Sequence, residues 1–136
     1  MGDKSFKLEI VTPQRIVFSG DVNSFTAPGA LGSFQVLYNH APLLSLIGVG
    51  VAKFTDTLGV EVHYATGGGF VEVMNNKVVL LAESAERSDE IDVKRAESAK
   101  ERALRRLAEK NSEINMDRAR VALFRAENRL KLAGRA

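Results

Sequence analysis

The stretch SDEIDVKRAESAKERALRRLAEK, residues 88–110, decides the architecture of this 136-residue chain. It contains no glycine, proline or aromatic residue. Four of its apolar residues are spaced three, four and four positions apart, which places them in one stripe along an α-helix; they are Ala96, Ala99, Ala103 and Leu107. Ser88 or Asp89 is the expected N-cap, with the carboxylate of Glu90 in the first turn. We therefore predict a helix with a narrow apolar side.

A second helix is predicted after the break KNSEIN, residues 110–115. Asn115 or Asp117 is its expected N-cap. An equivalent stripe with spacings of four, three and four follows, formed by Ala119, Leu123, Ala126 and Leu130. Two alanine-rich stripes favour an antiparallel helical hairpin. Because alanine buries little apolar area, docking of the two helices is worth only about a few kcal/mol. We expect the hairpin to open more readily than the rest of the chain unfolds.

The preceding residues show a different periodicity. In FKLEIV, residues 6–11, Phe6, Leu8 and Ile10 alternate with polar residues, as in a half-buried strand. Eight or more strands are predicted with no helical pattern between them, which favours antiparallel pairing in a sandwich or flattened barrel. The segments are 6–11, 15–20, 22–27, 33–37, 48–55, 60–65, 70–74 and 77–82, and TGGG at 66–69 is a predicted break.

Charge and aromatic content also divide the chain. Residues 1–84 hold 5 basic and 7 acidic residues, whereas residues 85–136 hold 14 and 10. Of the nine aromatic residues, only Phe124 follows residue 85. The predicted fold is therefore an N-terminal antiparallel β-sandwich or flattened barrel over residues 1–86, followed by a C-terminal antiparallel α-helical hairpin over residues 87–136.

Several functional classes are disfavoured by the sequence. The chain has no cysteine and hence no disulfide or thiolate metal site. GGGF at 67–70 lacks the ending of a phosphate-binding loop. His40 and His63 have no partners at metal or catalytic spacing, so His40 is expected to bond to loop backbone. No apolar run approaches the roughly 20 residues of a membrane span, and the N-terminus lacks an export signal. We predict neither catalytic nor metal-binding residues, and a cytoplasmic location.

The arginines of the hairpin suggest a site for an anion. Arg95 and Arg102 lie seven residues apart, and Arg125 and Arg129 lie four apart, so each pair shares a helix face. In a closed hairpin the four guanidinium groups can gather around a polyphosphate, with Asp92 and Glu86 nearby. Ordinary intrahelical pairing, such as Asp92 with Arg95, is the alternative. A nucleic-acid interface is a further alternative, but the interleaved acidic residues are more typical of a solvated helix surface.

Four segments, taken in order, resemble the epsilon subunits of bacterial F-type ATP synthases, called delta in mitochondria. They are LEIVTPQRIVFSG at 8–20, YNHAPLLSLI at 38–47, GGFVEV at 68–73 and VVLLAESAERSDEIDVKRA at 78–96. The resemblance implies a non-catalytic rotor subunit, peripheral to the cytoplasmic face of the cell membrane. Its β domain is expected to bind the gamma subunit and the c-ring. Its helices are expected to extend toward the alpha and beta subunits and block ATP hydrolysis.

The resemblance also implies a regulatory ATP site, with no cofactor required and the need for Mg²⁺ left open. The family motif Ile/Leu-Asp-x-x-Arg-Ala is matched at residues 91–96. The implied ATP-binding residues are Glu86, Ile91, Asp92, Arg95, Ala96, Arg102, Arg125 and Arg129. The implied interface with c-ring and gamma includes Ser33, Phe34, Tyr38 and His40, although Ser33 stands where the family commonly has an acidic residue. A freestanding ATP-sensing module is the alternative function.

Overall fold

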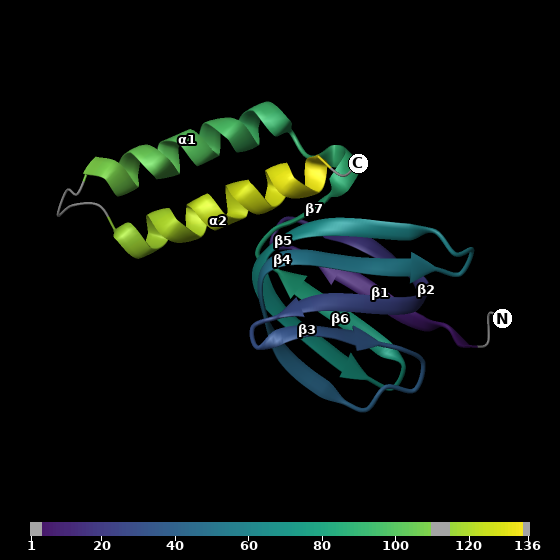
Figure 1. Ribbon diagram of the computed structural model, residues 1–136. Helices are drawn as coiled ribbons and strands as arrows, with labels where there is room; N and C mark the ends of the chain where they lie inside the picture. Colours follow the sequence, from purple (N-terminus) through teal and green to yellow (C-terminus); the bar gives the residue numbers. More distant parts are fainter. Residues whose placement is uncertain (1–3, 110–114, 135–136) are drawn as a thin grey trace. The chain divides into compact units, whose positions relative to one another are not determined.

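A computed structural model describes residues 4–109 and 115–134. The chain divides into two compact units, Met1–Arg87 and Ser88–Ala136. The first is built of β-strands and the second of helices (Figure 1). Each unit has its own buried residues, as expected from the change of hydrophobic period near residue 88.

The β unit is a single sheet closed on itself. Its order is β1-β6-β5-β4-β2-β3, and the additional pairing of β1 with β2 completes a ring of five strands. The predicted flattened barrel is confirmed. The strands are β1 Phe6–Val11, β2 Ile16–Gly29, β3 Gly32–Val36, β4 Leu43–Asp56, β5 Glu61–Met74, β6 Lys77–Ala82 and β7 Ala85–Arg87, with β7 paired to β5.

One pairing departs from the antiparallel expectation. β1 and β6 run parallel, with Leu8 opposite Val78 and Ile10 opposite Leu80. The other pairs of the ring are antiparallel. A closed ring with an odd number of strands cannot alternate direction throughout, so one neighbouring pair has to be parallel. Closure of the barrel is therefore the cause of this exception.

The predicted number of strands is wrong, because the described residues form seven. The predicted segments 15–20 and 22–27 belong to one strand, β2, and 60–65 and 70–74 belong to β5. The expected break at 66–69 is a bend within β5. There Gly69 has φ 144°, and a Cβ on it would lie 1.9 Å from the carbonyl oxygen of Leu81. Glycine here allows β6 to approach, so it continues the strand instead of ending it.

The barrel interior is filled by alternate strand residues. Phe6, Leu8 and Ile10 are buried, as predicted, while Lys7 on the same strand is exposed. The aromatic rings of Phe18 and Phe54 pack with centroids 4.3 Å apart. The remaining core includes Val22, Phe25, Val36, Val71, Val73, Val78 and Leu80. The β unit therefore has a continuous core of large side chains.

The helical unit comprises a 3₁₀ turn at Ser88–Glu90, α1 at Val93–Glu109 and α2 at Met116–Ala133. α1 and α2 pack side by side as an antiparallel hairpin (Figure 1), which confirms the predicted arrangement. The seam is rich in alanine as expected, since Ala96, Ala103, Ala119 and Ala126 are buried. The other four predicted positions are half-buried. None of the described helices is long and apolar enough to cross a membrane.

The predicted N-cap of α1 is wrong, whereas that of α2 is confirmed. Ser88 and Asp89 lie in the 3₁₀ turn, and α1 is capped by Asp92, whose Oδ1 accepts the main-chain N–H of Arg95 at 3.1 Å. The side chain of Asn115 accepts the N–H of Arg118 at 3.0 Å, as an N-cap should. Residues 88–90 form the 3₁₀ turn and not the start of α1. The N-cap of α1 is therefore the next acidic residue, Asp92.

Candidate functional site

An apolar row crosses the outer face of the barrel. The strand register places Leu46 opposite Phe70, Phe70 opposite Leu81, Leu81 beside Val11, and Val11 opposite Ile16. Directly paired residues point to the same face of a sheet. Leu46, Phe70, Leu81 and Ile16 are each between 49% and 58% exposed. Five adjacent strand segments thus contribute one apolar side chain each to a continuous surface, which we call the apolar row.

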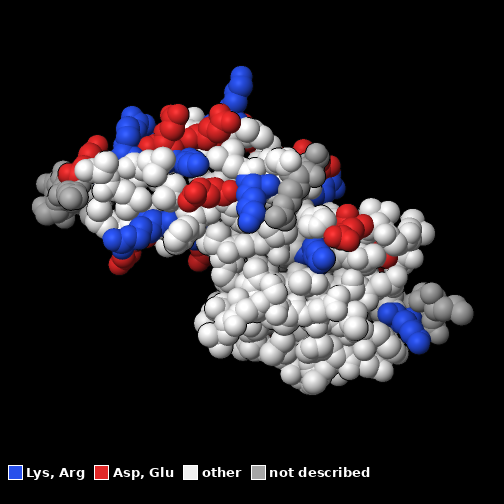
Figure 2. Space-filling view, viewed as in Figure 1, with Lys and Arg blue, Asp and Glu red and all other residues white. Residues whose placement is uncertain are grey.

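Charged residues lie on the same outer face of the barrel, two residues along each strand from the apolar row. The next row pairs Leu44 with Glu72, Glu72 with Val79 and Val79 with Glu9. The ammonium group of Lys77 lies 3.2 Å from Oε1 of Glu9. An apolar strip with a polar border is typical of a protein–protein docking surface. The displayed side of the β unit carries few charged residues, which gather instead on the hairpin (Figure 2).

The loop 37–42 between β3 and β4 carries two of the predicted interface residues, Tyr38 and His40. Tyr38 is exposed. His40 Nδ1 lies 2.7 Å from the carbonyl oxygen of Ala41, and because a carbonyl only accepts, Nδ1 carries the proton. The main-chain N–H of His40 donates to the carbonyl of Leu37 at 3.2 Å. The expectation that His40 bonds to loop backbone is confirmed.

Ser33 and Phe34, the other two interface residues predicted from the resemblance, lie apart from that loop on β3. Ser33 is exposed opposite Pro28, and Phe34 is half-buried against the core opposite Ala27. Ser33 precedes Val36, the last residue of β3, by roughly 10 Å of extended strand. The four predicted residues therefore form two groups along the chain, one on the strand and one in the loop.

A pair of asparagines fixes the loop 37–42 to the turn between β5 and β6. The main-chain N–H of Asn39 donates to Oδ1 of Asn76 at 2.7 Å, and Nδ2 of Asn76 donates to Oδ1 of Asn39 at 2.9 Å. We call this reciprocal contact the asparagine pair. Sequence reasoning missed it, because the partners are 37 residues apart. The only available signal was the tolerance of asparagine for left-handed backbone.

In the hairpin, the predicted nucleotide motif forms the start of α1. Ile91 is half-buried, Asp92 caps the helix, Arg95 is exposed and Ala96 is buried in the seam. The hydrogen bond between Asp92 and Arg95 is thus donated by the main-chain N–H of Arg95 and accepted by the carboxylate of Asp92. Glu86 belongs to the β unit, where it is half-buried on β7 opposite Ala65 of β5.

The four predicted arginines lie along one stretch of the hairpin. Arg95 is 14 residues from the end of α1 and Arg129 is 13 residues from the start of α2, so both lie about 20 Å from the connection. Arg102 and Arg125 lie about 10 and 14 Å from it by the same measure. The set therefore extends over roughly 10 Å of the hairpin axis.

The same arginines occupy one side of the seam. At about 100° per residue, Arg95 and Arg102 lie about 20° apart around α1, and Arg125 and Arg129 lie about 40° apart around α2. Around each helix axis, the arginine pair is rotated away from the buried alanines, and on both helices the rotation is in the sense in which residue number decreases. Because the helices run antiparallel, these offsets fall on the same side of the hairpin. Arg95 and Arg102 are exposed, whereas Arg125 and Arg129 are half-buried.

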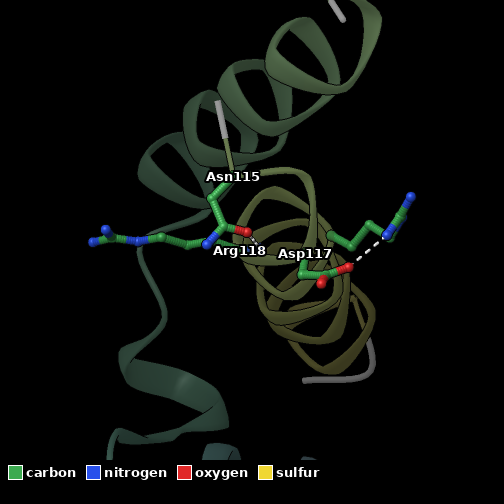
Figure 3. A network of polar contacts seen from close by, with 4 residues as sticks. Asn115, Asp117 and Arg118 are labelled. Atoms are coloured by element: carbon green, nitrogen blue, oxygen red, sulfur yellow. Dashed lines mark hydrogen bonds and ion pairs between the residues drawn. The ribbon is translucent and has the colours of Figure 1, made fainter. Parts of the chain in front are cut away.

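Other basic residues of the hairpin have local acidic neighbours. Figure 3 shows the first turn of α2, where Asn115 caps the helix and the carboxylate of Asp117 lies 2.7 Å from Nη1 of Arg120. This is an ordinary intrahelical ion pair between residues three apart, and neither residue belongs to the predicted site. On α1, Arg105, Arg106 and Glu109 join Arg102 around a shallow depression of about 280 Å³. The part of the chain that the structure describes contains no group of side chains suited to hold a metal ion.

A closed β-barrel followed in the chain by a helical hairpin, with an apolar row on the outer face of the barrel, presents a surface suited to contact with another protein. Residues 5–88 match the family described as ATP synthase, Delta/Epsilon chain, β-sandwich domain, and residues 89–134 match its long α-helix domain. The chain therefore belongs to the ATP synthase delta/epsilon chain family. Membership links it to ATP synthesis and to the ion transport coupled with it.

Relatives named ATP synthase epsilon chain match most of its length. The protein of Pelotomaculum thermopropionicum is 51% identical over 79% of this chain and 80% of its own. That of Desulforamulus reducens is 46% identical over 96% and 98%, and that of Nitratidesulfovibrio vulgaris is 45% identical over 98% and 99%.

Two solved structures share the fold. A chain in the Euglena gracilis mitochondrial ATP synthase OSCP/F1/c-ring structure has a TM-score of 0.80, with 20% identity over 92% of this chain and 79% of that chain. One in the Tetrahymena thermophila central stalk/c-ring structure has a TM-score of 0.56, with 14% identity over 95% and 93%. At these identities the likeness concerns the fold alone.

Proposed function

We propose that the chain is a non-catalytic rotor subunit of an F-type ATP synthase, coupling the gamma subunit to the c-ring at the cytoplasmic face of the membrane. The observation that carries this proposal is the apolar row. Side chains that are about half exposed and continuous across five strand segments are suited to burial against another protein. An ATP synthase is the assembly in which we expect this surface to be buried, because the relatives are named ATP synthase epsilon chain.

The docking role is tested by changing the apolar row. Phe70→Ser and Leu81→Ser place hydroxyls in the middle of the row, and Leu58→Ser is the control, because Leu58 is 87% exposed and precedes β5 in the turn that joins it to β4. Titration of the full chain with isolated gamma subunit should show at least about tenfold weaker binding for the first two variants. Equal binding by Phe70→Ser and the control would contradict this use of the row.

We place the loop 37–42, with Tyr38 and His40, against the c-ring. The loop is exposed and adjoins the start of β4, at the end of the barrel where β5 also ends and β6 begins. Ser33 supplies no carboxylate, so the contact relies on hydrogen bonds and the aromatic ring of Tyr38. Phe34 supports β3 from the core side.

The hairpin is the proposed brake on ATP hydrolysis, acting when its helices extend toward the alpha and beta subunits. The support is the small seam, since alanine-on-alanine packing stores little free energy against opening. Ending the chain after Arg87 should leave binding to gamma intact and raise the rate of ATP hydrolysis of the assembled enzyme. Unchanged hydrolysis would argue against the brake, whereas failure of the full chain to bind gamma would favour a freestanding ATP-sensing module.

ATP is the proposed ligand of the closed hairpin, held by Arg95, Arg102, Arg125 and Arg129, with Ile91, Asp92 and Ala96 in the first turn of α1 and Glu86 as a further contact implied by the family motif. Four guanidinium groups on one side of the seam suit a triphosphate. ATP then stabilises the closed form by RT ln(1 + [ATP]/Kd). The brake would accordingly be released when ATP is abundant.

The nucleotide site is tested by thermal unfolding of the full chain with and without ATP. Arg95→Ala should abolish the ATP-induced shift, while Arg105→Ala, which faces away from the seam, should retain it. Repeating the titration with and without Mg²⁺ decides whether the metal accompanies the nucleotide. Equal ATP-induced shifts of the unfolding temperature in wild type and Arg95→Ala would contradict the proposed ATP site.

A further inference from the structure

The backbone at the asparagine pair is held in a conformation that few residues adopt. Asn39 has φ 63° and Asn76 has φ 58°. Together with Asn75, at φ 51°, they are the only non-glycine residues with positive φ in the part of the chain described. Left-handed backbone is unfavourable for most residues that carry a side chain, and asparagine is among those that tolerate it best. Asn39, which lies outside the β5–β6 turn, adopts this backbone while joined to Asn76 by two hydrogen bonds.

Asn76 is the fixed partner of the pair. It lies in a two-residue turn, because Met74 and Lys77 on either side are paired in the β5–β6 register. Positive φ at both turn residues is the hairpin form that matches strand twist. The carbonyl of Asn76 also accepts the N–H of Lys7 on β1 at 3.0 Å. The backbone of Asn76, and with it the start of its side chain, is therefore fixed by the β5–β6 pairing and by the hydrogen bond from β1.

Asn39 belongs to the loop 37–42, which is more weakly tied to the barrel. Two hydrogen bonds of His40, to the carbonyl oxygens of Leu37 and Ala41, stay within the loop. The asparagine pair, in contrast, reaches from the loop to a different hairpin. Asn39 also lies between Tyr38 and His40 in sequence, so its position sets where both side chains emerge.

We propose that Asn39 and Asn76 are positioning residues that hold Tyr38 and His40 in the conformation required for docking onto the c-ring. This inference rests on the proposed function of the loop. A loop that is ordered before binding loses less conformational entropy on association and binds more tightly. The pair thus acts on docking through the loop, without needing to touch the partner.

Three glycine substitutions isolate the side-chain bonds. Asn76→Gly removes both hydrogen bonds, Asn39→Gly removes only the bond from Nδ2 of Asn76, and Asn75→Gly removes neither. All three replace a residue with positive φ by one that adopts it freely, so their backbone effects match. In the isolated full chain, exchange of the residue-39 amide proton should accelerate about tenfold in Asn76→Gly and stay unchanged in Asn75→Gly. Equal exchange in these two variants would overturn the ordering role.

The consequence for docking is measured in ATP synthase assembled with each variant and placed in vesicles. Asn76→Gly should lower the number of coupling ions pumped per ATP hydrolysed by about twofold, while Asn75→Gly should leave it unchanged. In a Tyr38→Ala, His40→Ala background, Asn76→Gly should have no further effect, which a merely stabilising residue would not show. If that background pumps normally, the proposed docking of the loop is wrong. If it is impaired but Asn76→Gly is not, the positioning role alone is wrong.

Discussion

Asp92 and Arg95, two residues of the predicted nucleotide motif, are joined by a 3.1 Å hydrogen bond from the main-chain N–H of Arg95 to the carboxylate of Asp92. The carboxylate of Asp92 therefore acts as the N-cap of α1. Since Ala96 follows in the buried seam, the cap also fixes the turn from which Arg95 projects.

The first prediction separates the cap from the charge at residue 92. Asp92→Asn keeps an oxygen that caps the helix and should change hairpin stability by a few tenths of a kcal/mol, whereas Asp92→Ala should cost about 1 kcal/mol. Urea unfolding followed by circular dichroism at 222 nm measures both. If Asp92 serves ATP binding by capping, Asn retains the ATP-induced thermal shift and Ala reduces it. Loss of the shift in both variants would assign the charge a direct role.

The second prediction concerns the alanine seam. Ala126 has 0% of its surface exposed, so Ala126→Leu forces a larger side chain between the helices and should destabilise the closed hairpin by about 1–3 kcal/mol. In the assembled enzyme this should increase the inhibition of hydrolysis, because opening becomes easier. Val121→Leu, at an exposed position of α2, is the control and should leave hydrolysis unchanged.

The third prediction uses two glycines with positive φ. Gly69→Ala introduces both strained backbone and a clash with the carbonyl of Leu81, and should destabilise the barrel by more than about 2 kcal/mol. Gly59→Ala, at φ 85° with no atom within 4 Å of the added Cβ, carries only the backbone strain of about 1–2 kcal/mol. Chemical denaturation compares them directly. Equal losses would mean that β6 relaxes away from Gly69.

The fourth prediction compares neighbours on β6 that point to opposite faces. Leu80 is fully buried and Leu81 belongs to the apolar row. Leu80→Ala should cost about 2–5 kcal/mol of folding stability, and Leu81→Ala about 0.5 kcal/mol or less. Binding to gamma should show the reverse order of sensitivity once both proteins are folded. A large stability loss for Leu81→Ala would show that this side chain belongs to the core.

The sequence was sufficient for features that depend on local period. The buried alternation of Phe6, Leu8 and Ile10, and the alanine seam of the hairpin, follow from spacing alone. Features that depend on distant partners were not accessible. Gly69 reads as a strand terminator until β6 is known to lie against it, and the parallel β1–β6 pair follows only once the ring is known to close on five strands.

The candidate sites divide in the same way. The arginines could be grouped in advance because helix geometry fixes their spacing. The apolar row could not, since its members come from five segments whose register is set by the whole barrel. The asparagine pair joins residues whose local sequence gives no reason to meet. Asp92 was predicted as a site residue, but its capping role required the end of the 3₁₀ turn to be known.

Closure of the barrel also affects how readily free copies of the chain aggregate through their strand edges. Among the strands described, those with a neighbour on one side only are β3 and β7, of 5 and 3 residues. Long unpaired strand edges are templates on which identical chains add to one another and aggregate. Because the strands at the ends of the sheet are short, the β unit offers little edge on which copies of the chain could pair.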